Sequence, residues 1–183
     1  APIAGENVEA AEGFWIERPW LLYRIADGGI GSPIVPELPG WDRKDRLMDA
    51  SFHPGEDILV LLNQTKEALS FVRLEGGGAT LRLVPWGNSV GIDRAPYLAR
   101  FSPDGRHVIT NATYSGPDIL DGGFGAPHGT LIPIKLDHKR DAWGSPVHVV
   151  VSRAQTGVGP EGFAISPDGK WVVSTNVERT PLP

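Results

Sequence analysis

The residues best suited to chemistry in this sequence lie in one long stretch between two apolar segments. The stretch runs from Tyr114 to His128 and contains Asp118 and Asp121. Carboxylates and an imidazole are groups that proteins use for general acid–base catalysis, so His128, Asp121 and Asp118 are the candidate catalytic residues. Long loops in compact domains are uncommon and often carry binding or lid functions, so contact with a ligand is one alternative and a plain loop is the other. One His and two Asp match no fixed metal-ligand spacing, so no metal or other cofactor is expected.

A second set of side chains could bind a polar ligand directly. They lie near the ends of short apolar segments and supply guanidinium, phenol, amide and carboxylate groups, which fix the orientation of a ligand in a binding site. The candidate ligand-binding residues are Arg46, Arg94, Tyr97, Asn111, Tyr114, Glu161 and Glu178. The sequence contains no nucleophile elbow and no phosphate-binding loop.

The elements that must position these side chains repeat one pattern. Residues 50–63, 99–111 and 163–176 each read as a short apolar strand, a turn with Pro and Gly, a second apolar strand and an Asn. Pro presets φ, and Asp and Gly accept a tight reversal, so each segment is predicted to be a β-hairpin. The simpler interpretation of each closing Asn, Asn111 included, is that its amide bonds nearby backbone. A repeated unit that cannot bury its own face must stack against its copies.

Further short apolar segments complete an all-β prediction. The 23 Gly and 17 Pro, without any long helical pattern, favour many turns and short strands. The third and fourth strands that follow the hairpins are expected at 68–74 with 80–86 and at 129–136 with 146–152, and an earlier pair is expected at 19–25 with 32–38. The predicted fold is about three four-stranded antiparallel blades of a β-propeller.

Residues 1–183 are expected to form a partial propeller. Its divisions are a partial blade at 1–40, blades at 41–88 and 89–152, and the first half of a blade at 153–183, with an insertion at 112–128. Propellers close with roughly 4–8 blades, so this ring stays open unless another segment or chain completes it. The missing blades could come from a longer protein or another chain, or a second copy could form a six-bladed dimer. In the third alternative the rest of the ring is disordered or deleted, and an apolar strand edge stays uncovered.

The turns of the repeat carry a family resemblance. Ser-Pro-Asp-Gly occurs at 102–105 and 166–169, the latter within Gly159-Pro-Glu-Gly-Phe-Ala-Ile-Ser-Pro-Asp-Gly169. This pattern resembles the repeat of the YVTN and lactonase-type propellers, which include 6-phosphogluconolactonase-like proteins. The resemblance implies a propeller fold and hydrolysis of a ring ester. In that group the turn into a blade's first strand often reads Gly-Pro-Arg-His, whereas here residues 159–162 and 95–98 contain neither Arg nor His.

The composition limits which kinds of partner and which cellular locations are expected. The net charge of −5 is spread along the chain, so no basic stripe is available for nucleic acid. No apolar run approaches the roughly 20 residues that span a bilayer. The chain has no Cys, which fits cytoplasm and periplasm alike, and its start, Ala1-Pro-Ile-Ala-Gly5, could remain after cleavage of a signal peptide. A periplasmic or secreted location is expected, with the cytoplasm as the alternative.

Propeller geometry suggests where a function would lie. The turns between first and second strands lie on one face, and the other connections lie at the mouth of the central channel, where ligands bind in this fold. We expect a propeller scaffold that binds a small molecule or a protein partner at this channel face. The alternative is a lactonase-type hydrolase that acts on a ring ester, and the absent Arg and His favour the scaffold.

Overall fold

β-Strands make up the regular structure of the chain in the computed structural model. The structure describes residues 21–26, 28–35, 37–38, 40–42, 44–77, 80–114 and 128–176. All of the regular elements in these ranges are strands, arranged in antiparallel sheets that do not close into a ring. The prediction of an all-β, open, propeller-like fold is therefore confirmed. No helix in these ranges is long and apolar enough to cross a membrane.

The first large sheet contains the first of the predicted hairpins. Its strands are β3 (Leu47–Phe52), β4 (Ile58–Asn63), β5 (Ala68–Glu75), β6 (Arg82–Pro85) and β7 (Val90–Gly91). They lie in the order β3-β4-β5-β6, and β7 pairs with the other end of β5. The outer position of this sheet is thus shared by two short strands, because the chain leaves the ladder between β6 and β7.

The second large sheet repeats this plan. Its strands are β8 (Arg94–Phe101), β9 (His107–Tyr114), β10 (His128–Arg140), β11 (Pro146–Val150) and β12 (Ala154–Val158). They lie in the order β8-β9-β10-β11, and β12 pairs with the start of β10. The sheet therefore continues past residue 152, the expected end of this blade, and β9 extends to Tyr114, into the expected insertion.

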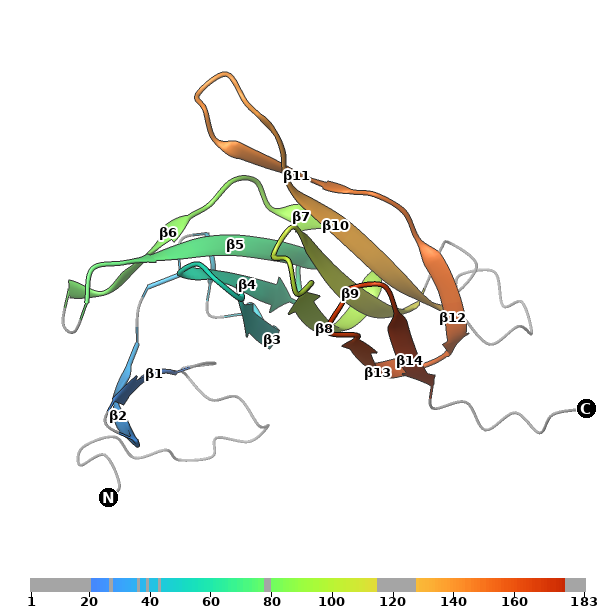
Figure 1. Ribbon diagram of the computed structural model, residues 1–183, viewed down its shortest axis with the longest axis horizontal. Coiled ribbons are helices and arrows are strands. Elements are labelled where there is room, and N and C mark those ends of the chain that lie inside the picture. The colour runs from blue at the N-terminus through green and yellow to red at the C-terminus, as the bar shows by residue number, and fades with distance from the viewer. Residues whose placement is uncertain are drawn as a thin grey trace, which may run out of the picture.

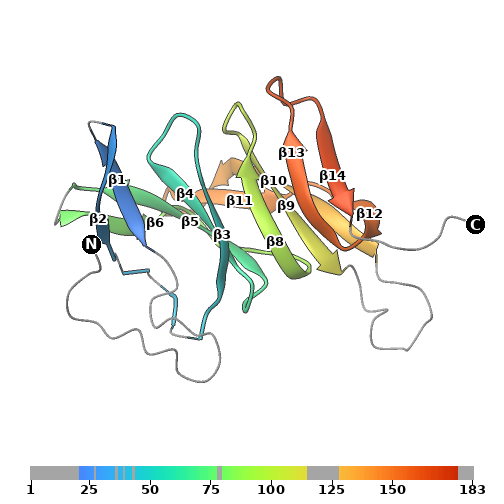
Figure 2. The same cartoon turned by 90° about the horizontal axis from the view of Figure 1, so that it is seen from below.

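Two hairpins flank the large sheets. They are β1 (Leu22–Ala26) with β2 (Gly29–Ile34) and β13 (Pro160–Ile165) with β14 (Val172–Asn176). Figure 1 shows the sheets fanned out in chain order, with the β1–β2 hairpin at one end and the β13–β14 hairpin at the other. β3 lies beside β8, and β8 beside β13. In Figure 2 the β3–β4, β8–β9 and β13–β14 turns all point the same way.

The apolar core lies mainly between the two large sheets. Every residue of β4 is buried, because this strand is covered on both faces. Ile58, Val60 and Leu62 face the second sheet and pack in the cluster that includes Val108 and Ile132. The alternate residues of β4 pack in a smaller cluster on the opposite face. Coverage of both faces explains why β4 lacks the alternation of polar and apolar residues typical of a half-exposed strand.

The Ser-Pro-Asp-Gly turns use identical hydrogen bonds. In the β8–β9 turn the Ser102 hydroxyl donates to Asp104 Oδ1 (2.6 Å), which also accepts the Arg106 N–H (3.0 Å). Gly105 takes a φ of 69°, a conformation that glycine adopts without strain. The bond from the Ser102 hydroxyl, followed by that from the Arg106 amide, lowers the pKa of Asp104.

The β13–β14 turn repeats these bonds with Ser166, Asp168 and Lys170 at 2.6 and 3.1 Å. In the β3–β4 turn His53 stands in place of the serine, and its ring packs edge-on against Phe101 at 5.1 Å between centroids. The β3–β4 turn therefore lacks the Ser-Pro-Asp-Gly sequence, and the residue in place of the serine, His53, contacts the second large sheet through Phe101.

A second contact joins the outer parts of the two large sheets. His148 on β11 is buried, and its ring lies 4.7 Å from that of Trp86. The Asp137 N–H donates to His148 Nδ1 (3.1 Å), so Nε2 carries the proton and donates to the Trp86 carbonyl (2.8 Å). Asn88 bonds the backbone N–H and carbonyl of His148 at 2.7 and 3.1 Å. His148 is thus a structural residue of the sheet-to-sheet contact.

Candidate functional site

The candidate site is built around the turn that joins β4 to β5, residues 64–67. Asn63 at the end of β4 accepts the Lys66 N–H on Oδ1 (3.0 Å) and so shapes this turn. The Arg46 N–H donates to Thr65 Oγ1 (3.0 Å), and the Gln64 N–H donates to the Arg46 carbonyl (2.9 Å). The residues before β3 are therefore fastened to this turn by backbone as well as side-chain bonds.

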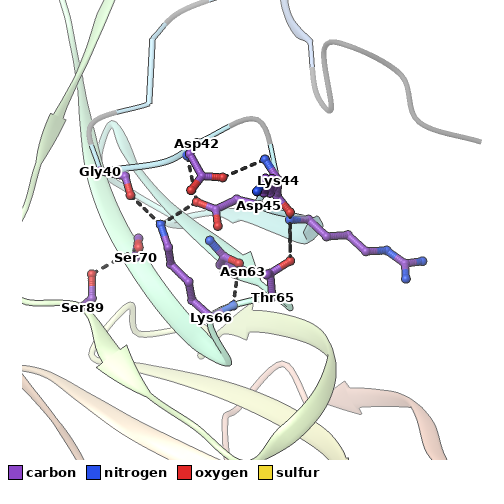
Figure 3. A network of polar contacts seen from close by, with 10 residues as sticks. Gly40, Asp42, Lys44, Asp45, Asn63, Thr65, Lys66, Ser70 and Ser89 are labelled. Atoms are coloured by element: carbon purple, nitrogen blue, oxygen red, sulfur yellow. Dashed lines mark hydrogen bonds and ion pairs between the residues drawn. The ribbon is translucent and has the colours of Figure 1, made fainter.

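An ion pair lies beneath the turn. Lys66 Nζ lies 2.6 Å from Asp45 Oδ2 and donates to the Gly40 carbonyl at 2.7 Å. The Asp42 N–H also donates to Asp45 Oδ2 at 3.0 Å. Figure 3 shows Lys66 reaching across to Gly40 and Asp45 from its turn. Burial opposes ionisation of Asp45, but the bonds from Lys66, Asp42 and Asn63 outweigh it and lower the pKa of this carboxyl.

A second ion pair occupies the corresponding place in the next sheet. Asp93 precedes β8 as Asp45 precedes β3, and it accepts from the Thr130 hydroxyl (3.0 Å) and from Arg153 Nε (2.9 Å). Thr130 is buried, whereas Arg153 is half exposed. Both connections into a first strand therefore place an Asp inside the structure against a cation.

The residue after each of these Asp residues is an arginine at the surface. Arg46 and Arg94 are both exposed. Arg94 Nε lies 3.5 Å from Glu67 Oε1, which belongs to the same turn that fastens Arg46. Within the described part of the chain, the Arg46 guanidinium forms no ion pair. Arg46 through its backbone and Arg94 through its guanidinium thus both contact the turn of residues 64–67.

A third carboxylate ties β3 to β8. Asp49 Oδ2 accepts the Ala99 N–H at 2.8 Å and pairs with the Arg100 guanidinium. Arg100 also donates to the Ala99 carbonyl at 2.7 Å. The carboxylates of Asp45, Asp49 and Asp93 therefore each already have a cationic partner.

Asn111 has a structural position. It is fully buried on β9; Oδ1 accepts the Leu98 N–H at 2.8 Å, and Nδ2 donates to the Pro160 carbonyl. Leu98 lies where the β8–β9 register shifts, so the amide replaces a missing ladder bond and links β9 to β13. Both ends of the amide are occupied by backbone, as the simpler interpretation predicts.

The remaining candidates are dispersed. Tyr97 is half buried on β8, and Glu161 is exposed on β13. Tyr114 ends β9, while exposed His128 begins β10, where it is the register partner of Val158. Asp118, Asp121 and Glu178 lie outside the described residues. Of the predicted binding residues, the structure thus brings Arg46 and Arg94 to a common turn.

Sequence reasoning missed Asp45, Thr65 and Arg153 as members of these networks. A signal for Asp45 was available, because Asp-Arg occurs at 45–46 and 93–94, with the same separation before Asn63 and Asn111. Thr65 lies in the β4–β5 turn and Arg153 lies between β11 and β12, and no comparable sequence pattern marks either position. Among the described residues, no three His, Cys, Asp or Glu side chains are grouped to hold a metal ion.

Comparisons with known proteins bear on the fold alone. No protein-family model matches the chain, and no curated protein matches it significantly. A crystal structure of a "putative 6-phosphogluconolactonase" from Bacteroides uniformis matches with a TM-score of 0.55 and 13% identity, over 88% of this chain and 42% of that one. A protein of the same description from Bacteroides fragilis matches with a TM-score of 0.48 and 18% identity, over 72% of this chain and 32% of that one. The chain has a lactonase-like β fold and spans less than half the length of either protein.

Proposed function

We propose that this chain is part of a β-propeller scaffold that binds a small anionic molecule at the side of the sheets where β3 and β8 begin. The observation that carries the proposal is the Asp-Arg dipeptide at 45–46 and at 93–94, whose Asp is paired with a cation and whose Arg is exposed. Lys66 neutralises Asp45, so the exposed Arg46 adds one positive charge to the surface. Among the described residues, Arg94 is opposed by the half-exposed Glu67 alone. Arg46 bonds the turn of residues 64–67 through its backbone and Arg94 contacts it through its guanidinium, so the proposed ligand would lie beside this turn.

The chemistry of arginine suits this role. A guanidinium presents a planar set of donors that matches a carboxylate or phosphate, and it stays protonated at all relevant pH values. Arg46 has no ion-pair partner within the described residues, and the 3.5 Å contact of Arg94 with Glu67 is long and exposed. An exposed pair of this kind contributes little stability. A ligand anion could therefore replace Glu67 at small cost.

The second candidate function is a lactonase-type hydrolase, which the fold likeness to the Bacteroides uniformis protein favours. Hydrolysis of a ring ester needs a base that activates water. The ion pairs of Asp45, Asp49 and Asp93 work against that role, since each carboxylate would have to break its ion pair before it could act as the base. The proposed hydrolase would use His128 with Asp118 and Asp121, and the binding scaffold would not need them.

Titration calorimetry tests the binding proposal. Inorganic phosphate, gluconate and glucose would be titrated into the 183-residue chain, and the two anions but not glucose should bind. Arg46→Ala and Arg94→Ala should each weaken anion binding about tenfold or more, the effect of one lost charge-assisted hydrogen bond. Arg106→Ala, in the β8–β9 turn away from this side, is the matched control. Equal affinity of all three variants and the parent for phosphate would refute the proposal.

The hydrolase alternative is tested on the same samples. Incubation with 6-phosphogluconolactone, followed by measurement of acid release, should give the uncatalysed rate if the scaffold proposal holds. Turnover that falls on His128→Ala and survives Arg46→Ala would favour the hydrolase instead.

A further inference from the structure

The two terminal hairpins are complementary halves of one four-stranded sheet. The β13–β14 turn repeats the hydrogen bonds of the β8–β9 turn, so β13 and β14 correspond to the first and second strands of a large sheet. The β1–β2 hairpin precedes β3 as β5 and β6 precede β8, which makes it the equivalent of third and fourth strands. In both large sheets the second strand pairs with the third in antiparallel fashion.

The outer edge of β14 is exposed where its counterparts are buried. The position of Val172, counted from the serine of the turn, corresponds to Val108 on β9 and Leu59 on β4. Val172 is 38% exposed, whereas Val108 and Leu59 are 0% and 3% exposed. Trp171 and Val173 beside it are exposed as well. Among the described residues, β14 pairs only with β13, so this apolar edge has no covering strand.

The β1–β2 hairpin has a matching exposed surface. Ile25 and Ile30 are cross-strand neighbours and are 78% and 74% exposed. In the large sheets the third strand is instead a core strand, as Phe71 on β5 and Ile134 on β10 are buried. An exposed apolar pair of this kind, on a hairpin that pairs with no other described strand, is a site for association.

We propose that β14 of one copy pairs antiparallel with β1 of a second copy, and β1 of the first with β14 of the second. A single two-fold axis generates both contacts, and closed two-fold assemblies are the commonest among oligomers. Each composite sheet would then have four strands, and two copies would form a ring of six sheets, within the 4–8 of closed propellers.

The choice of a second copy follows from two observations. Both exposed edges belong to the same chain and are complementary, so two copies pair both of these described edges at once. The chain also matches 42% of the length of the Bacteroides uniformis protein, so two copies would account for most of that length. In Figure 1 the two hairpins lie at opposite ends of the fan, where such contacts would close a ring.

Sedimentation equilibrium of the 183-residue chain tests this assembly. The expected mass is twice the 19.7 kDa of one chain, and the β14 amides that point away from β13 should exchange slowly with solvent only at concentrations where the dimer forms. Val172→Lys would place a charge in the composite sheet and should raise the dimer dissociation constant at least about tenfold. Val151→Lys, at an exposed valine between β11 and β12, is the matched control and should leave it unchanged.

Three results would overturn the assembly. One is a monomer at all concentrations, because β14 and β1 would then have to be paired by a different segment of a longer protein. Another is an open-ended polymer, because the two-fold contacts close. The third is a dimer that Val172→Lys and Val151→Lys affect equally, because its contacts would lie elsewhere.

Discussion

Replacing Gly87 by Ala should show how closely the two large sheets approach at their outer strands. Gly87 lies between β6 and β7 with a φ of 79°, next to Trp86, whose carbonyl accepts from His148. A Cβ at this position would overlap the Pro146 carbonyl and lie 2.5 Å from His148 Nε2. Both neighbours belong to β11, which is anchored in the second sheet, so neither can move without disturbing the contact between sheets.

The expected cost has two parts. A non-glycine residue in the left-handed region costs about 1–2 kcal/mol, and overpacking against fixed neighbours adds about 1–3 kcal/mol. Gly144 gives a matched control, because its φ is 80° and a Cβ there would meet nothing within 4 Å. Gly144→Ala should therefore lose only the first part. The gain from a stiffer unfolded chain is common to both variants and cancels in the comparison.

Urea unfolding followed by tryptophan fluorescence measures this difference. Gly87→Ala should lower the free energy of unfolding by about 1–3 kcal/mol more than Gly144→Ala does, the overpacking part alone. Equal losses in the two variants would refute the reasoning, because they would mean that only backbone conformation matters at Gly87 and that β11 does not approach it.

The remaining predictions concern the contacts between sheets. Burial lowers the pKa of His148 against the opposing effects of the Trp86 carbonyl and Asp137, so its contribution to stability is present above its ordinary pKa of about 6.5 and is lost as the pH falls below that value. The free energy of unfolding should fall by at most about 1.4 kcal/mol per pH unit in that range, a dependence that should disappear in His148→Gln; an unchanged profile in this variant would assign the effect to another group. Asn111→Ala should destabilise the chain by about 2–4 kcal/mol, because it leaves the Leu98 N–H and the buried Pro160 carbonyl without a partner. Asn111→Asp should cost at least as much, because its carboxylate would be buried against the Pro160 carbonyl; a smaller loss than for Asn111→Ala in calorimetric unfolding would contradict the role of the Pro160 bond.

The repeat made the hairpins of the large sheets predictable. Pro103, Asp104 and Gly105 set the turn locally, and the apolar strands on either side can be buried only against neighbouring sheets. The broken outer strands were not predictable in this way. β7 and β12 return to their sheets after short excursions, and their pairing depends on contacts such as that of Asn88 with His148, which lie far apart in the sequence.

The candidate site was predictable in part. The exposure of Arg46 and Arg94 agrees with their place in connections between strands. Their meeting at the turn of residues 64–67 follows from bonds that Thr65 and Glu67 make across the sheets. Asp45 is buried although it lies in a connection, because Lys66 reaches it from the other side of the turn. Such pairings depend on tertiary structure, and no local pattern specifies the partner.

The central claim is that the Asp-Arg dipeptides form one anion-binding surface around residues 64–67. The most direct measurement is an NMR titration of the 183-residue chain with inorganic phosphate. The amide signals of Arg46, Gln64, Glu67 and Arg94 should shift together and saturate with one dissociation constant, while those of Ser102 and Arg106 stay in place. Shifts spread evenly over the basic residues, or confined to the β8–β9 turn, would contradict the claim.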